Sequence, residues 1–106
     1  MNDRTKALAI PQAVKKAVAE RDSFDGWPCC ILCGKPAPGT LWSNAHYTAR
    51  SQGGLGIEEN IVTLCPGCHR AYDQSPRREE IRVHIKAYLQ SRYPEWDENN
   101  LIFEKR

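Results

Sequence analysis

NIVTLCPGCHRAYD, residues 60–73, is the stretch of this 106-residue chain that decides its fold. The apolar run 61–64 predicts a short strand, because β-branched residues favour extended backbone. The cysteine pair that follows forms a tight knuckle, and after it His69 and Asp73 stand at positions i and i+4. On a helix these two side chains share one face. The stretch therefore predicts a strand, a knuckle and a helix that presents an imidazole beside a carboxylate.

Two cysteine pairs of equal spacing, Cys30-x-x-Cys33 and Cys65-x-x-Cys68, predict a structural zinc site. Each pair turns both sulfurs toward one point, and two pairs supply the four tetrahedral ligands of Zn²⁺ at about 2.3 Å. The 31 residues between the pairs exceed the separation in small zinc fingers, so the site brackets an inserted hairpin. Two alternatives are a thioredoxin-type redox pair and unrelated buried cysteines, and neither explains two pairs. Cys29 is a possible substitute for Cys30, but only Cys30 repeats the spacing of the second pair.

Composition limits the classes of protein to which the chain can belong. The 15 basic and 13 acidic residues give a net charge of +2, too weak to indicate nucleic-acid binding by itself. No apolar run approaches the roughly 20 residues of a membrane span, and the first residues lack a secretory apolar core. We therefore expect no membrane association and a cytoplasmic location, where thiols stay reduced and paired cysteines bind metal. A chain of this length predicts one domain, residues 1–106, with a modest core that a metal site would reinforce.

Apolar periodicity predicts a helix on each side of the motif core 30–73. An N-terminal helix is expected at about 11–21 and a C-terminal helix at about 76–92, each beginning at a proline, a residue suited to the first helical position. The second of these helices carries an apolar stripe for burial, made of Ile81, Ile85, Tyr88 and Leu89.

Extended segments and loops are expected between these helices. Residues 41–48 and 60–64 predict two strands, and residues 101–103 predict a short edge strand. Residues 34–40 contain two prolines and two glycines and predict a loop. The connection 49–59 must bend sharply and can bring its backbone close to a ligand, because it is rich in glycine. Its glycines are Gly53, Gly54 and Gly56.

The order of these motifs resembles the HNH endonuclease family, and phage and prophage members most of all. The residues that carry the resemblance are Ala45-His46, Arg50-Ser51-Gln52-Gly53-Gly54, Asn60 to Cys65, Cys68-His69 and Asp73. The resemblance spans Cys30 to Asp73. It implies a small α+β domain with a ββα-metal (His-Me finger) core, stabilised by zinc and flanked by N- and C-terminal helices.

The resemblance also implies a catalytic site. His46 is expected to be the general base that takes a proton from the attacking water, a task that suits a neutral imidazole near pH 7. Asn60 is expected to hydrogen-bond across the loop and so hold His46 at its angle. His69 and Asp73 are expected to hold a catalytic divalent ion, Mg²⁺ or Mn²⁺, which stabilises charge on the phosphate. The implied substrate is DNA, cut to a 5′-phosphate and a 3′-hydroxyl.

Two arginines flank this expected site. Arg50 and Arg70 are candidates for binding DNA phosphates, and they serve equally well as solvated surface charges. The sequence leaves open the DNA site, the choice between nicking and double-strand cleavage, and the oligomeric state.

Two positions depart from the family pattern. Asp73 stands where many members have histidine, a mild change that favours Mg²⁺ or Mn²⁺ through a hard oxygen. Ala45 replaces a residue that commonly binds the metal. Either His69 and Asp73 hold the ion with water and phosphate, or Asn44 or His46 fills the gap, or the site is degenerate. In the last case the chain is a non-catalytic nucleic-acid-binding module, or an interaction module that serves a phage packaging machine or another protein partner.

Overall fold

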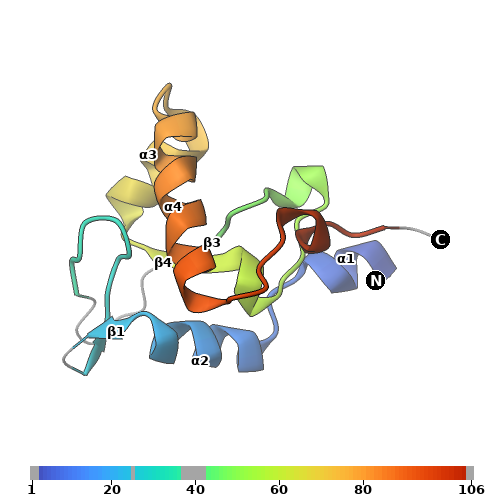
Figure 1. Ribbon diagram of the computed structural model, residues 1–106, viewed down its shortest axis with the longest axis horizontal. Helices are drawn as coiled ribbons and strands as arrows, with labels where there is room; N and C mark the ends of the chain where they lie inside the picture. Colours follow the sequence, from blue (N-terminus) through green and yellow to red (C-terminus); the bar gives the residue numbers. More distant parts are fainter. Residues whose placement is uncertain (1–2, 25, 37–42, 105–106) are drawn as a thin grey trace.

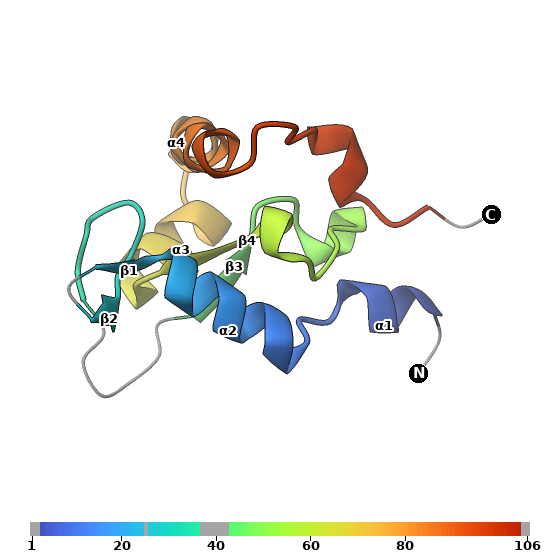
Figure 2. The ribbon, with the colours of Figure 1, turned by 60° about the horizontal axis from the view of Figure 1, so that its bottom comes forward.

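A hairpin of two short strands lies at the centre of the molecule. The computed structural model describes residues 3–24, 26–36 and 43–104. In it β3 (Ser43–His46) pairs antiparallel with β4 (Ile61–Leu64), in a register that runs from Ser43 opposite Leu64 to His46 opposite Ile61. Helices α1 and α2 lie on one side of this hairpin and helices α3 and α4 on the other (Figures 1 and 2). All four residues of β4 are buried as a result.

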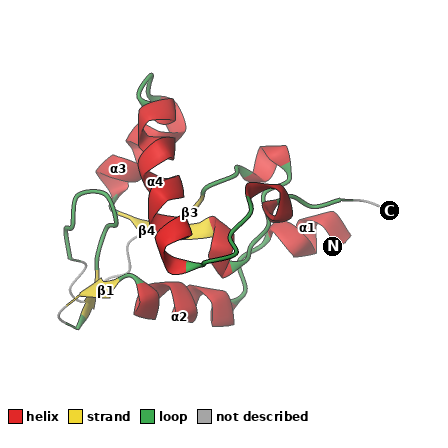
Figure 3. Ribbon diagram, in the orientation of Figure 1, coloured by secondary structure: helices red, strands yellow, loops and turns green. Residues whose placement is uncertain are grey.

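The first part of the chain supplies the layer under the hairpin. It contains α1 (Asp3–Leu8), α2 (Gln12–Arg21) and a small hairpin of β1 (Ser23–Phe24) and β2 (Trp27–Pro28) (Figure 3). α2 corresponds to the helix expected at about 11–21, with Pro11 at the cap position rather than inside the helix. α1 was not expected, because six residues are too few to show a helical apolar period.

In the second part of the chain α3 (Pro66–Gln74) and α4 (Arg78–Arg92) form the opposite layer. The 3₁₀ turns of this part are η1 (Arg50–Gln52), η2 (Glu58–Asn60), which contacts α2, and η3 (Glu98–Leu101). α4 starts two residues after the expected position 76. The reason is that Ser75 closes a turn instead, in which its Oγ accepts from Arg77 N at 3.0 Å and its carbonyl from Arg78 N at 3.2 Å.

The extended segments are shorter than the sequence indicates. β3 ends at His46 rather than at residue 48, while residues 41 and 42 of the expected strand lie outside the described residues. The expected edge strand at 101–103 is reduced to one bridge between Gly54 and Ile102, because Leu101 completes the 3₁₀ turn of η3. Of the expected loop 34–40, the part from residue 37 onward also lies outside the described residues.

The apolar core lies between the hairpin, α3 and α4. α4 contributes the side chains of Ile81, Ile85 and Leu89 as expected, with Tyr88 half-buried beside them. The core cluster is formed by Cys30, Ala45, Tyr47, Val62, Leu64, Cys65, Tyr72, Ile81, Ile85, Leu89 and Leu101. The predicted α+β class, made of helices and short antiparallel strands, is confirmed.

A buried ion pair ties α2 to the hairpin and to α4. Arg21 donates to both carboxylate oxygens of Asp22, at 2.7 and 3.0 Å, and the Asp22 side chain has no exposed surface. Asp22 also accepts from the backbone N–H of Thr63 at 3.0 Å and from the hydroxyl of Tyr88. Arg21 donates further to the carbonyl of Ile61 at 2.7 Å. A buried charge pair is tolerated when its remaining hydrogen-bonding capacity is used in this way.

Among the described residues, no helix is both long and apolar enough to cross a membrane.

Candidate zinc cluster and catalytic site

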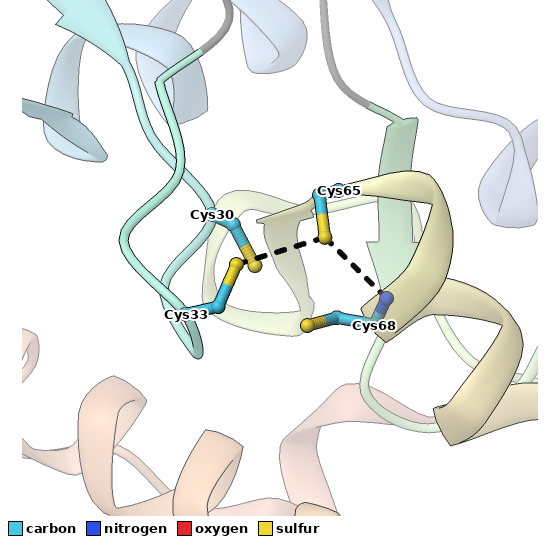
Figure 4. Close-up of side chains that lie close together, drawn as sticks. All are labelled: Cys30, Cys33, Cys65 and Cys68. Atoms are coloured by element: carbon cyan, nitrogen blue, oxygen red, sulfur yellow. Dashed lines mark hydrogen bonds between the residues drawn. The ribbon is translucent and has the colours of Figure 1, made fainter.

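Four cysteine sulfurs meet at one point between the hairpin and the start of α3. The Sγ atoms of Cys30, Cys33, Cys65 and Cys68 all lie within 4.8 Å of one another, and their side chains face each other (Figure 4). The distance from Cys33 Sγ to Cys65 Sγ is 3.7 Å. A tetrahedral zinc with bonds of about 2.3 Å separates its sulfur ligands by about 3.8 Å. The four side chains therefore fit the predicted zinc ion in both number and spacing.

The first knuckle is held by its own backbone and by β4. Gly34 N donates to Cys30 O at 2.9 Å, and Cys30 N donates to Lys35 O at 3.0 Å. Gly34 adopts a φ of 77°, a left-handed conformation that suits glycine. Ile31 N donates to Thr63 O at 3.0 Å, so the knuckle is attached to the central hairpin. The two cysteines of this knuckle are thus placed by backbone contacts.

The second knuckle coincides with the start of α3. Cys65 is the N-cap of this helix, and its Sγ accepts from the backbone N–H of Cys68 at 3.4 Å. Burial raises the pKa of Cys65, but hydrogen bonds from the Cys68 N–H and from neighbouring thiols outweigh burial and bring the pKa to about 7. A thiol that ionises near neutral pH is prepared for metal binding. Cys29 lies outside the cluster, with its Sγ 3.3 Å from the carbonyl of Trp27.

His46 ends β3 and is half-buried. Its Nε2 lies 3.0 Å from the carbonyl oxygen of Leu8, at the end of α1. Burial lowers the pKa of His46 from 6.5, the hydrogen bond to Leu8 opposes that change, and Coulomb interactions with Arg50 and His69 lower the pKa further. The imidazole is therefore neutral at pH 7. β3, which ends at His46, contacts α3, the helix that carries His69.

Asn60 is fully buried and holds the ends of the glycine-rich loop. Its Oδ1 accepts from Thr48 N at 2.8 Å, while its Nδ2 donates to Thr48 O at 3.2 Å and to Leu55 O at 2.8 Å. Asn60 O accepts in turn from Tyr47 N at 2.8 Å, one residue beyond His46. The amide therefore fixes the loop that begins directly after β3. Asn60 contacts the main chain of Tyr47 and Thr48, directly after His46, so any effect of Asn60 on the angle of His46 is indirect.

His69 and Asp73 lie together on one face of α3, as the spacing predicts. His69 Nε2 is 3.2 Å from Asp73 Oδ2, and their side chains are 28% and 52% exposed. Adjacent ligands of an octahedral Mg²⁺ with bonds of about 2.1 Å lie about 3 Å apart, so the pair fits two positions of such a site. Apart from the four cysteines, the described residues contain no group of three or more His, Cys, Asp or Glu side chains that could hold a metal ion.

The side chain at position 45 points into the core. Ala45 is 1% exposed and packs in the same cluster as Val62 and Tyr72. Asn44 is its neighbour on β3 and lines a cavity of about 290 Å³ against α2, together with Lys16. Neither side chain is placed to complete a metal site on α3.

Arg50 and Arg70 are both exposed. Arg50 lies in η1, and its carbonyl accepts from Arg4 Nη2 at 3.2 Å. Arg70 lies on α3, next to His69. The contact of these two arginines with DNA phosphates stays a prediction.

Two features of the site were not recognised from the sequence. One is the carbonyl of Leu8, because a contact between a side chain and a distant backbone atom leaves no pattern. The other is the purpose of the glycines. A Cβ at Gly54 would lie 1.7 Å from Thr48 O, and a Cβ at Gly56 would lie 1.9 Å from Ala9 O. At Gly54 and Gly56 the close approach that the glycines indicate is thus made to the chain's own backbone.

Comparison with known proteins gives two matches. The model of the HNH endonuclease family matches residues 30–75, in agreement with the resemblance that the sequence motifs show. The chain is also 36% identical over 58 residues to the type IV methyl-directed restriction enzyme EcoKMcrA of Escherichia coli (strain K12). This match covers 49% of the chain and 21% of the length of the relative, so the chain spans about a fifth of that enzyme. Both similarities support a nuclease-type function.

The cysteine cluster predicts that removing one of its thiolates causes loss of both the zinc ion and the folded structure. In Cys30→Ser one thiolate is missing, and we expect the chain to lose its zinc and unfold, since a structural zinc contributes on the order of 10 kcal/mol. Cys29→Ser is the matched control, because this neighbouring thiol lies outside the cluster, and it should keep about one zinc per chain. Metal analysis and far-ultraviolet circular dichroism measure both effects. Full zinc content in Cys30→Ser would contradict the assignment.

The contacts of Asn60 predict a specific effect of its isosteric replacement. Asn60→Asp keeps an acceptor for Thr48 N but removes both donors, so two carbonyls face a buried carboxylate. We expect the free energy of unfolding to fall by about 2–4 kcal/mol. Asn99→Asp, at an exposed position, should change it by less than about 0.5 kcal/mol. Urea denaturation compares the two variants, and equal stability would show that the Asn60 amide does not hold the loop.

Proposed function

We propose, on the premise that residues 30–75 match the HNH endonuclease family, that the protein is a metal-dependent endonuclease that hydrolyses phosphodiester bonds of DNA. The observation that carries the proposal is the pair of possible metal ligands on α3, His69 Nε2 and Asp73 Oδ2 at 3.2 Å, on a helix that contacts β3, the strand that ends at His46. A base and a pair of metal-binding atoms on one surface are what hydrolysis of a phosphodiester requires.

In the proposed reaction His46 takes a proton from the water that attacks phosphorus. A neutral imidazole accepts this proton at neutral pH, because its pKa is held below the ordinary value of 6.5. As the new P–O bond forms, the bond from phosphorus to the 3′-oxygen breaks, and the leaving oxygen takes a proton from solvent water. The products are a 5′-phosphate and a 3′-hydroxyl. The exposed guanidinium groups of Arg50 and Arg70 bind the neighbouring phosphates and orient the strand.

His69 and Asp73 would hold the catalytic divalent ion through the Nε2 and Oδ2 atoms that lie 3.2 Å apart. When bound, Mg²⁺ or Mn²⁺ stabilises negative charge on the phosphate and on the leaving oxygen. The hard carboxylate oxygen of Asp73 favours these two metals over zinc. Water and the substrate phosphate are left to complete the coordination, because Ala45 is buried in the core.

One observation favours a second candidate function. Ala45 occupies the position at which the family pattern commonly has a metal ligand, and it is packed as a core residue. A chain that cannot retain the ion would be a zinc-stabilised module that binds nucleic acid without cleaving it. Retained DNA binding without cleavage in Mg²⁺, Mn²⁺ or Zn²⁺ would support this function.

Nicking of supercoiled plasmid tests the proposed function. The zinc-loaded protein should nick DNA when Mg²⁺ or Mn²⁺ is added, and EDTA should stop the reaction. His46→Ala should lower the rate by roughly 10²–10⁴-fold, the usual contribution of a general base, and should keep its zinc. His84→Ala is the matched control, because this exposed histidine lies on α4 and belongs to no predicted site. Equal rates for His46→Ala and the unchanged protein would exclude His46 as the base.

The pKa of His46 predicts the pH dependence of cleavage. The base must be neutral, so kcat/KM should fall only as the pH drops through a pKa that lies below 6.5. The positive charge of Arg50 lowers this pKa, so Arg50→Ala should raise it and move the acid limb of the profile to higher pH. Arg77→Ala, exposed in the turn between α3 and α4, should leave the midpoint in place. A shift of the Arg50→Ala midpoint to lower pH would be inconsistent with this assignment.

A further inference from the structure

We propose that residues 3–10, here called the N-terminal arm, form part of the catalytic site, and that the main-chain carbonyl of Leu8 is a positioning group for His46. The inference rests on the proposed function, because it explains how the proposed base is held. The arm lies outside residues 30–75, the segment that matches the HNH endonuclease family.

The hydrogen bond between His46 and Leu8 selects one form of the imidazole. A carbonyl oxygen can only accept, so the contact of 3.0 Å requires a hydrogen on Nε2. In a neutral ring the lone pair then lies on Nδ1. The arm therefore keeps His46 in the tautomer whose Nδ1 is the base, and it fixes the plane of the ring at the end of β3. An imidazole without this partner would divide between two tautomers.

The carbonyl is available because α1 ends at Leu8. The last carbonyls of a helix have no partner within the helix and need one elsewhere. Ala7 O accepts from Gly56 N at 2.9 Å, and Leu8 O is paired with His46. The Leu8 side chain is 2% exposed, so the end of the arm is anchored in the interior. Arg4 adds a contact at the other end of α1, where its Nη2 donates to Arg50 O at 3.2 Å.

Gly56 determines how closely the arm approaches the loop. A Cβ at this position would lie 1.9 Å from Ala9 O and 2.5 Å from Ala9 C, distances that force backbone to move. The preceding residue, Leu55, is held by the Nδ2 of Asn60 at 2.8 Å. The arm is therefore set against a loop whose own position is fixed, and any larger residue at 56 must displace the arm.

Gly56→Ala tests the inference in the full-length protein. The added methyl should push the arm away and remove the hydrogen bond to His46 without touching the cysteine cluster. We expect kcat for plasmid nicking to fall roughly 10–100-fold, as small misplacements of catalytic groups do, with little change in KM. Gln90→Ala is the control, because this exposed residue lies on α4 and belongs to no predicted site. Metal analysis and circular dichroism should give the same zinc content and fold for both variants.

Nitrogen-15 spectra of the histidine rings supply a readout that a purely structural role would not change. The unchanged protein should show His46 with hydrogen on Nε2 and none on Nδ1. Gly56→Ala should show a mixture of the two tautomers, and Gln90→Ala should match the unchanged protein. If Gly56→Ala fails to fold, Leu8→Ala, which shortens the buried anchor of the arm, takes its place with the same expected spectrum.

The outcomes separate the inference from the proposed function. His46 of the unchanged protein with hydrogen on Nδ1 would overturn the inference whatever the variants do. So would a Gly56→Ala protein that has lost the single tautomer yet nicks DNA at the unchanged rate. Absence of nicking by the unchanged protein in every metal would instead overturn the proposed function, and the ring spectra would still decide whether the arm holds His46.

Discussion

The four-cysteine cluster is the constraint on which the rest of the molecule depends. It joins the first knuckle, residues 30–33, to the first turn of α3 across the central hairpin, in a chain whose apolar core is small. β4 runs directly into Cys65, so the cluster determines where α3 begins and in which direction it leaves the hairpin. The face of α3 that carries His69 and Asp73 is oriented as a consequence. One cysteine pair of the cluster, Cys65 and Cys68, and the proposed catalytic ligands are thus carried by the same helix with separate tasks.

Residues 30–75 and the segments on either side of them have different roles in the structure. Residues 30–75 carry the cysteine cluster and each side chain to which we assign catalysis. The flanking segments hold this machinery in place through backbone contacts. α1 pairs with Gly56 and His46, and residues 101–103 pair with the loop through Leu55 N to Leu101 O at 2.8 Å and Phe103 N to Gly53 O at 2.8 Å. Two stretches nearly a hundred residues apart in the chain therefore meet at one loop, as Figure 1 shows for α1 and the segment after η3.

Much of the arrangement was predictable, because the features concerned are local in the sequence. Equal spacing of two cysteine pairs predicts a shared ion, and a separation of four residues places His69 beside Asp73. The stripe through Ile85 and Leu89 predicts a buried helix. Features that depend on distant backbone were missed, among them α1, the contact of Leu8 with His46, and the buried pair of Arg21 and Asp22. A carbonyl is the same at every position of a sequence, so no residue type indicates which one a histidine will meet.

The contacts of residues 101–103 also have a consequence for local opening of the domain. The loop that borders His46 makes two main-chain hydrogen bonds with this segment, Leu55 N to Leu101 O and Phe103 N to Gly53 O. A segment attached by a few hydrogen bonds can open without global unfolding. Such an opening would leave the loop supported by α1 and Asn60 while the cysteine cluster stays assembled.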